Sequence, residues 1–125
     1  LSKNLSSVVG KDKGGTTELM NSVLCMDFTK MPHAGMLDMV LHPSAVSGEE
    51  GLEAFKGIIR AYFKRGGHSI QFNIFSSETL RLAQKYPEQY KNLQVRVCGW
   101  NVYFVELEKV LQNAFIEQSE HYEGL

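Results

Sequence analysis

The sequence predicts a protein of the α/β class, which as an isolated piece would be described as α+β. Two observations support this prediction. Segments with helical periodicity alternate with segments of strand periodicity along the 125 residues of the chain. Near the C-terminal end, two strand-like segments, 93–97 and 102–105, flank a loop that contains Gly99. The predicted order is therefore helix, strand, helix, strand, helix, strand, glycine loop, strand, helix.

The first two elements are predicted to be a short helix and a strand. Apolar residues recur at helical spacing within 18–26, and Thr16 or Thr17 is positioned to cap the N-terminus of this helix. Residues 36–43 alternate as a strand does, and Pro43 closes them because proline cannot donate to a strand ladder.

Residues 47–67 contain the clearest helix. Ser47 is a candidate cap, and Gly66 and Gly67 are expected to end the helix. Its apolar stripe is predicted to consist of Leu52, Phe55, Ile58, Ile59, Tyr62 and Phe63.

The second half continues the alternation. Residues 68–75 read as a half-buried strand, with Ser69, Gln71 and Asn73 on a polar face. Residues 76–90 begin with a serine cap and form a helix that ends near Pro87. The last helix lies within 106–122, and its apolar stripe is predicted to consist of Leu107, Val110, Leu111, Ala114, Phe115 and Gln118.

Composition excludes several classes of function. The net charge is −1, from 13 basic and 14 acidic side chains, which gives no electrostatic argument for binding nucleic acid or an anionic membrane. No apolar run approaches the roughly 20 residues that span a bilayer. We therefore expect a soluble cytoplasmic protein with no nucleic-acid or membrane partner.

The two cysteines indicate the redox state of the chain, and the first fifteen residues indicate where its domain begins. Cys25 and Cys98 lie far apart and form no metal-binding pattern, so we expect no metal site and favour reduced thiols, although one disulfide stays possible. Residues 1–15 are polar and glycine-rich, and they are predicted to be a loop that continues from something upstream. Residues 16–125 are then one domain.

Gly99 admits two interpretations. A glycine inside a strand pattern usually marks a tight turn or bulge. Here, however, apolar strands and Trp100 flank the glycine, whereas a solvated hairpin favours Asn-Gly or Asp-Gly. We therefore expect a buried tip.

The stretch RVCGWNVYF, residues 96–104, resembles the RVxGY motif of glycyl radical enzymes, the pyruvate formate-lyase-like superfamily. Residues 41–75 and 80–97 and the closing helix resemble further blocks of that family in the same order, and residues 11–23 resemble the segment before this domain. The resemblance implies a C-terminal glycyl radical domain. It also implies that residues 1–15 continue from a ten-stranded α/β barrel, of which residues 16–125 form the C-terminal part, with the glycine loop between two strands.

By this resemblance, Gly99 is the catalytic residue, oxidised to a stored radical. Loss of an α-hydrogen leaves a carbon radical conjugated with an amide nitrogen and a carbonyl. That conjugation requires a planar α-carbon, which a side chain would crowd. A separate radical S-adenosylmethionine activase with an iron–sulfur cluster would remove the hydrogen atom, so no cofactor need bind this chain.

Residues around Gly99 are predicted to support the radical loop: Arg96, Val97, Cys98 and Trp100. Arg96 could bond loop carbonyls, a carboxylate of a partner, or a cross-strand ion partner. Cys98 is interpreted as a small packed residue, with a redox-sensitive neighbour of the radical as the alternative. Trp100 departs from the tyrosine usual in the motif. His68 and Gln71 are possible loop-lining residues, and a structural role for His68 is the alternative.

The resemblance also implies partners. These are the activase, the barrel carrying the cysteine that becomes a thiyl radical, and a second copy in a homodimer. Neither Cys25 nor Cys98 matches the motif of that cysteine. The sequence favours a lyase, dehydratase or decarboxylase of anaerobic metabolism over a formate acetyltransferase. Two alternatives stay open: a spare-part protein that repairs an oxygen-damaged partner, and a non-catalytic α+β binding module.

Overall fold

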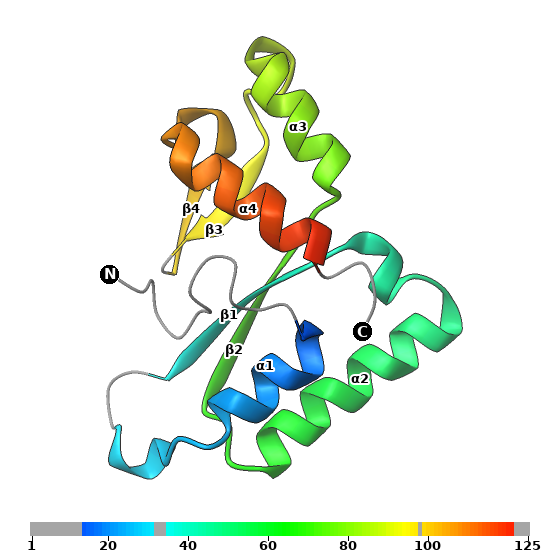
Figure 1. Ribbon diagram of the computed structural model, residues 1–125, viewed down its shortest axis with the longest axis vertical. Helices are drawn as coiled ribbons and strands as arrows, with labels where there is room; N and C mark the ends of the chain where they lie inside the picture. The colour runs from blue at the N-terminus through cyan, green and yellow to red at the C-terminus, as the bar shows by residue number, and fades with distance from the viewer. Residues whose placement is uncertain (1–13, 32–34, 98, 122–125) are drawn as a thin grey trace.

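A computed structural model describes residues 14–31, 35–97 and 99–121 of the chain (Figure 1). Within these ranges the regular elements follow the predicted order. The α-helices are α1 (Gly15–Val23), α2 (Gly48–Lys64), α3 (Ser77–Lys85) and α4 (Lys109–His121). The strands are β1 (Met36–Leu41), β2 (Ser69–Ile74), β3 (Gln94–Val97) and β4 (Trp100–Tyr103). The prediction of a mixed α/β chain is confirmed.

The strands form two separate pairs. β1 and β2 are parallel, from Met36 opposite Ser69 to Leu41 opposite Ile74, and α2 makes the crossover that a parallel pair requires. β3 and β4 are antiparallel and form a hairpin in which Val97 lies opposite Trp100. We call this segment, residues 94–103, the glycine hairpin.

The β1–β2 pair has different partners on its two faces. Leu37 and Met39 of β1 pack in one hydrophobic cluster with residues of α1 and α2. Val40, which points the opposite way, belongs to a second cluster that also draws residues from α3, α4 and the glycine hairpin. Figure 1 shows the corresponding arrangement, with α1 and α2 on one side of the two strands and α3, α4 and the hairpin on the other.

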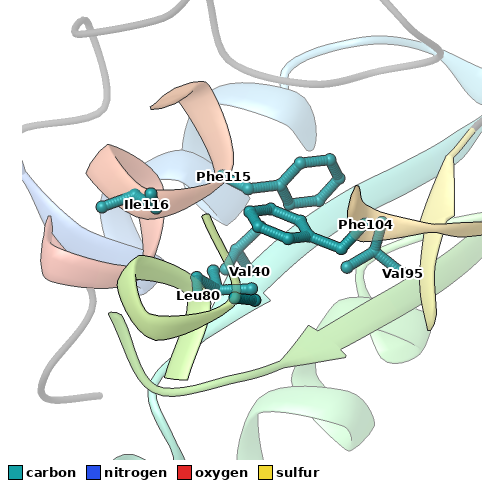
Figure 2. Close-up of a cluster of buried hydrophobic side chains, with 7 residues drawn as sticks. Val40, Leu80, Val95, Phe104, Phe115 and Ile116 are labelled. Carbon is teal, nitrogen blue, oxygen red and sulfur yellow. The ribbon is translucent and has the colours of Figure 1, made fainter. Parts of the chain in front are cut away.

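The second cluster supports the base of the glycine hairpin. Figure 2 shows Phe104 and Val95 lying beside Val40 and Leu80, with Phe115 and Ile116 of α4 above them. Phe104 is fully buried, and its backbone N–H donates to the carbonyl oxygen of Leu93 at 2.8 Å. The end of the hairpin where the chain enters and leaves is thus fixed in the core.

The predicted strand 102–105 is correct only to Tyr103. A 3₁₀ turn, Phe104–Glu106, follows β4 directly. The turn redirects the chain toward α4, and it carries the Phe104 ring into the core.

Two helix caps differ from the prediction. α1 begins at Gly15 after Gly14, so the proposed cap at Thr16 or Thr17 is wrong, and Thr16 is buried within the first turn. Ser47 does occupy the N-cap position of α2, but its hydroxyl donates to the carbonyl oxygen of Ser44 at 2.9 Å and makes no cap bond. Ser76 caps α3 as expected, accepting from the N–H of Thr79 at 3.1 Å.

The buried face of α4 is rotated relative to the predicted stripe. Val110 is 76% exposed, whereas Gln112 and Ser119 are buried beside Phe115 and Ile116. Hydrogen bonds explain this rotation. The side-chain amide of Gln112 donates to the carbonyl oxygens of Phe104 (3.0 Å) and Leu107 (3.1 Å). The hydroxyl of Ser119 donates to the carbonyl oxygen of Phe75 (2.7 Å). These bonds need polar residues on the buried side.

Two further findings concern the predicted class of protein. Among the described residues, no helix is long and apolar enough to cross a membrane. Cys25 is an exposed free thiol in this structure, and Cys98 lies outside the described residues.

Candidate functional site

Gly99 lies in the turn of the glycine hairpin with a backbone φ of +86°. L-residues rarely adopt this conformation, so the turn itself requires a glycine. There is nevertheless room beside it: a Cβ built on Gly99 would have the Cε of Met36, at 3.9 Å, as its nearest neighbour. The backbone, and not crowding, therefore selects glycine here.

The hairpin is buried at its base and exposed toward its turn. Val95, near the base, is 1% exposed, whereas Trp100 is 75% exposed. Gly99 itself is half-buried. The expectation of a buried tip is thus wrong for this chain by itself, because the hairpin is longer than the core that covers it. Val97, one of the predicted support residues, is also half-buried.

Asn73 joins β2 to the glycine hairpin through the main chain of Arg96. The N–H of Arg96 donates to Asn73 Oδ1 at 2.9 Å, and Asn73 Nδ2 donates to the carbonyl oxygen of Arg96 at 3.0 Å. Asn73 is only 5% exposed. One buried side-chain amide thus supplies both hydrogen bonds that a neighbouring strand would otherwise provide.

The guanidinium of Arg96 bonds neutral oxygens. Its Nε donates to Gln71 Oε1 at 2.9 Å, and its Nη1 donates to Asn101 Oδ1 at 3.0 Å. Asn101 is the cross-strand neighbour of Arg96, so a cross-strand contact exists, but its partner is an amide and not the carboxylate of the predicted ion pair. Arg96 thus spans the two strand pairs.

Gln71 and Asn73 point to the same side of β2, facing the hairpin. Gln71 contacts the side chain of Arg96 in β3, and a loop-lining role for Gln71 stays a prediction. Its Nε2 is buried without a hydrogen-bond partner among the described residues. The sequence places Asn73 on a polar face of this strand but does not mark it as a site residue. The alternation of polar residues, with Gln71 and Asn73 on one face, is the sequence feature that points to it.

The remaining predicted site residues are less closely connected. His68 is exposed and directly precedes β2. Its Cβ lies close to Gly35, because a Cβ added to Gly35 would be only 3.1 Å from the Cβ of His68. A loop-lining role for His68 stays a prediction. Cys98 lies outside the described residues. Met36, which the sequence did not single out, neighbours Gly99 because the first residue of β1 faces the hairpin.

A metal centre is not evident in the part of the chain that the structure describes. There, no three or more His, Cys, Asp or Glu side chains gather in a group that could hold an ion. The hydrogen bonds between β2 and the hairpin come from the amides of Gln71 and Asn73 and the guanidinium of Arg96, groups that can orient a backbone.

Comparison with known proteins gives the family. The model of the glycine radical family matches residues 1–105 of the chain, a range that includes the glycine hairpin. Similar curated proteins include the indoleacetate decarboxylase of Tractidigestivibacter scatoligenes, 42% identical over 94% of this chain. They also include the trans-4-hydroxy-L-proline dehydratase of Clostridioides difficile, 39% identical over 96% of this chain.

Solved structures agree with this match. A B12-independent glycerol dehydratase from Clostridium butyricum superimposes with a TM-score of 0.85 at 36% identity, over 95% of this chain and 15% of the dehydratase. The hydroxyproline dehydratase from Clostridioides difficile gives the same TM-score at 39% identity, over 94% of this chain and 15% of that enzyme.

The chain spans only a small part of these relatives: 13% of the decarboxylase and 15% of the hydroxyproline dehydratase by sequence. Fold and sequence nevertheless point to the same domain, with the motif-bearing glycine in the turn of its hairpin. The chain is a glycyl radical domain and belongs to the glycine radical family of the glycyl radical enzymes.

Proposed function

We propose that Gly99 stores the radical of a glycyl radical enzyme. The observation that supports this most directly is the position of Gly99. It is the glycine of the RVCGW motif, within the matched range 1–105, and it lies in the turn of a hairpin that extends beyond its own core.

The proposed chemistry begins with removal of one hydrogen atom. An activase of the radical S-adenosylmethionine class takes the hydrogen and one electron of a Cα–H bond, and the other electron stays on the α-carbon. Delocalisation into both amides is greatest when they lie in the plane of that carbon. A φ of +86° holds the preceding amide out of this plane. Radical formation therefore requires rotation about the N–Cα bond of Gly99.

The stored radical then acts on a second protein segment. A cysteine of the barrel, outside this chain, gives its thiol hydrogen atom to Gly99 and becomes the thiyl radical that attacks the substrate. Cys25 is exposed on the segment after α1, and no observation connects it with Gly99. The relatives include decarboxylases and dehydratases, and we propose a lyase-type reaction of that kind for the whole enzyme, which we place in the cytoplasm as a homodimer.

Electron paramagnetic resonance tests the proposal. The protein, with its barrel, is treated anaerobically with an activase, S-adenosylmethionine and a reductant. We expect a doublet from one α-hydrogen and, after exposure to air, cleavage of the backbone at Gly99. Gly99→Ala should abolish both, because alanine is strained at this positive φ and its methyl group would crowd the flanking amides of a flat radical.

Gly66 supplies a matched control. Its φ of +92° is close to that of Gly99, and a Cβ there would meet nothing within 4 Å. Gly66→Ala should impose similar backbone strain and keep the doublet and the cleavage. A doublet that survives Gly99→Ala would show that the radical resides elsewhere.

A further inference from the structure

We propose that Asn73 is a positioning residue that sets how far the glycine hairpin reaches toward its thiol partner. The inference rests on the proposed function, because it concerns the placement of the radical on Gly99. Its basis is the pair of hydrogen bonds between the side chain of Asn73 and the main chain of Arg96.

The geometry of these bonds makes Asn73 different from an ordinary buried amide. Arg96 lies opposite Asn101 on β4, and its N–H and C=O point the other way, toward β2. No backbone ladder joins β2 to β3 in the described sheets. Asn73 substitutes for one rung of such a ladder, and it fixes the hairpin at a residue three positions before Gly99.

The other polar link between the same elements is more exposed to solvent. Arg96 Nε bonds Gln71 Oε1 at 2.9 Å, but Arg96 is an exposed residue, so water competes for this bond. Hydrophobic packing holds the hairpin through buried Val95 and through the partly buried Val97 and Val102, but it leaves Trp100 75% exposed. The buried bonds of Asn73 add to this packing the two hydrogen bonds that fix the direction of the main chain just before Gly99.

Placement matters because hydrogen-atom transfer needs close approach of the two reacting atoms. Displacement by about 1 Å can slow a positioned reaction on the order of 100-fold. Loss of Asn73 should consequently affect transfer between Gly99 and the thiol, more than it affects folding of the domain.

Deuterium exchange of the radical provides a readout that needs no substrate. The thiol gives its hydrogen atom to Gly99: the S–H bond breaks, a C–H bond forms, and the unpaired electron passes to sulfur. In D₂O the thiol carries deuterium, so Gly99 receives deuterium. When the thiyl takes back the original hydrogen, Gly99 keeps deuterium, and the doublet collapses toward a singlet. The collapse rate measures productive contact between Gly99 and the thiol.

The test compares Asn73→Leu and Asn73→Asp with Gln112→Leu in the whole protein, barrel included. Leucine removes both bonds, and aspartate keeps the acceptor but loses the donor. Gln112 is a matched control, since it is also 5% exposed and also bonds two main-chain groups, at Phe104 and Leu107. Amide exchange at Arg96 is measured in parallel.

We expect Asn73→Leu to expose the Arg96 N–H to exchange and to slow doublet collapse by at least about tenfold per radical. Asn73→Asp should slow the collapse while keeping the Arg96 N–H protected, and it serves alone if the leucine variant does not fold. Gln112→Leu should change neither quantity. Equal collapse rates in all variants, or equal slowing by Gln112→Leu, would overturn the inference. Absence of any doublet in the wild-type protein would instead refute the radical on Gly99.

Discussion

Tyr62 shows how one side chain fixes the connection from α2 to β2. Its ring is fully buried, and its hydroxyl donates to the carbonyl oxygen of Ser69 at 3.1 Å, at the start of β2. The ring lies so close to Gly67 that any side chain there would clash with it, at 2.4 Å from Cε1. Gly67 is therefore required by close packing, whereas neighbouring Gly66 is required by its positive φ.

Burial raises the pKa of Tyr62 above its ordinary value, and a backbone hydrogen bond opposes this only in part. A raised pKa means that the folded state binds the phenolic proton more tightly than the unfolded state. The stabilisation is fully present below about pH 10 and is lost as the pH rises through the raised folded-state value. We expect the urea midpoint to fall on alkalinisation, and to fall less in Tyr62→Phe.

The control for this effect is Tyr86→Phe, because Tyr86 is exposed. At alkaline pH, the urea midpoint of that variant should fall as much as the midpoint of the wild-type protein. If the midpoint of Tyr62→Phe also fell as much as that of the wild type, Tyr62 would not be the cause of the lost stability. At neutral pH, Tyr62→Phe should cost about 1 kcal/mol, since the Ser69 carbonyl loses its donor.

At the scale of elements, local patterns predicted which helices and strands exist, and tertiary contacts decided which faces they bury. α2 carries the predicted apolar stripe, yet of its residues only Tyr62 is fully buried, and Leu52 and Phe63 remain about half exposed. α4 buries Gln112 and Ser119, because carbonyl oxygens of other segments need donors. Periodicity cannot reveal such distant partners.

The site shows the same limit. Gly99 could be found from its motif, and Gln71 from the polar face of its strand. The pairing of Asn73 with the Arg96 main chain joins residues 23 positions apart, so it depends on how β2 meets β3. The exposure of Trp100 was not predictable, because strand pattern does not tell how far a core extends.

The caps of α2 and α3 provide a direct comparison of two serines. Ser76 accepts from the N–H of Thr79, whereas Ser47 donates to Ser44 and leaves the α2 terminus uncapped by a side chain. Ser76→Ala should lower the free energy of unfolding by about 1 kcal/mol, and Ser47→Ala by less. Chemical denaturation of the two variants measures the difference; equal losses would mean that the cap bond at Ser76 contributes nothing particular.

For the whole molecule, exposed apolar side chains occur on several elements, and the glycine hairpin carries one of the most exposed. Trp100, the one tryptophan of the sequence, is 75% exposed beside Gly99. Leu52 and Phe63 of α2 are also partly exposed. A hairpin fixed at its base and open at its turn can be inserted into a second structure without being rebuilt.

Trp100 makes that insertion measurable. In the free chain its fluorescence should be that of a solvated indole, and association with the barrel should shift the emission to shorter wavelength as the ring leaves water. Trp100→Phe removes the signal and serves as the blank. Unchanged emission in a complex shown to have formed would mean that the turn stays in water, contrary to the proposed docking.

The strand pairing of β1 with β2 determines which side chains of the two strands face the glycine hairpin. Met36, Gln71 and Asn73 all face the hairpin, and Leu37 and Phe72 face the helices, because side chains alternate along each strand. Insertion of one residue at the start of β2 would reverse this assignment and present Phe72 to the main chain of Arg96 in place of an amide, and deletion of one residue would present Ile74. Changes of length in this strand should therefore be tolerated only in steps of two, however far they lie from the glycine.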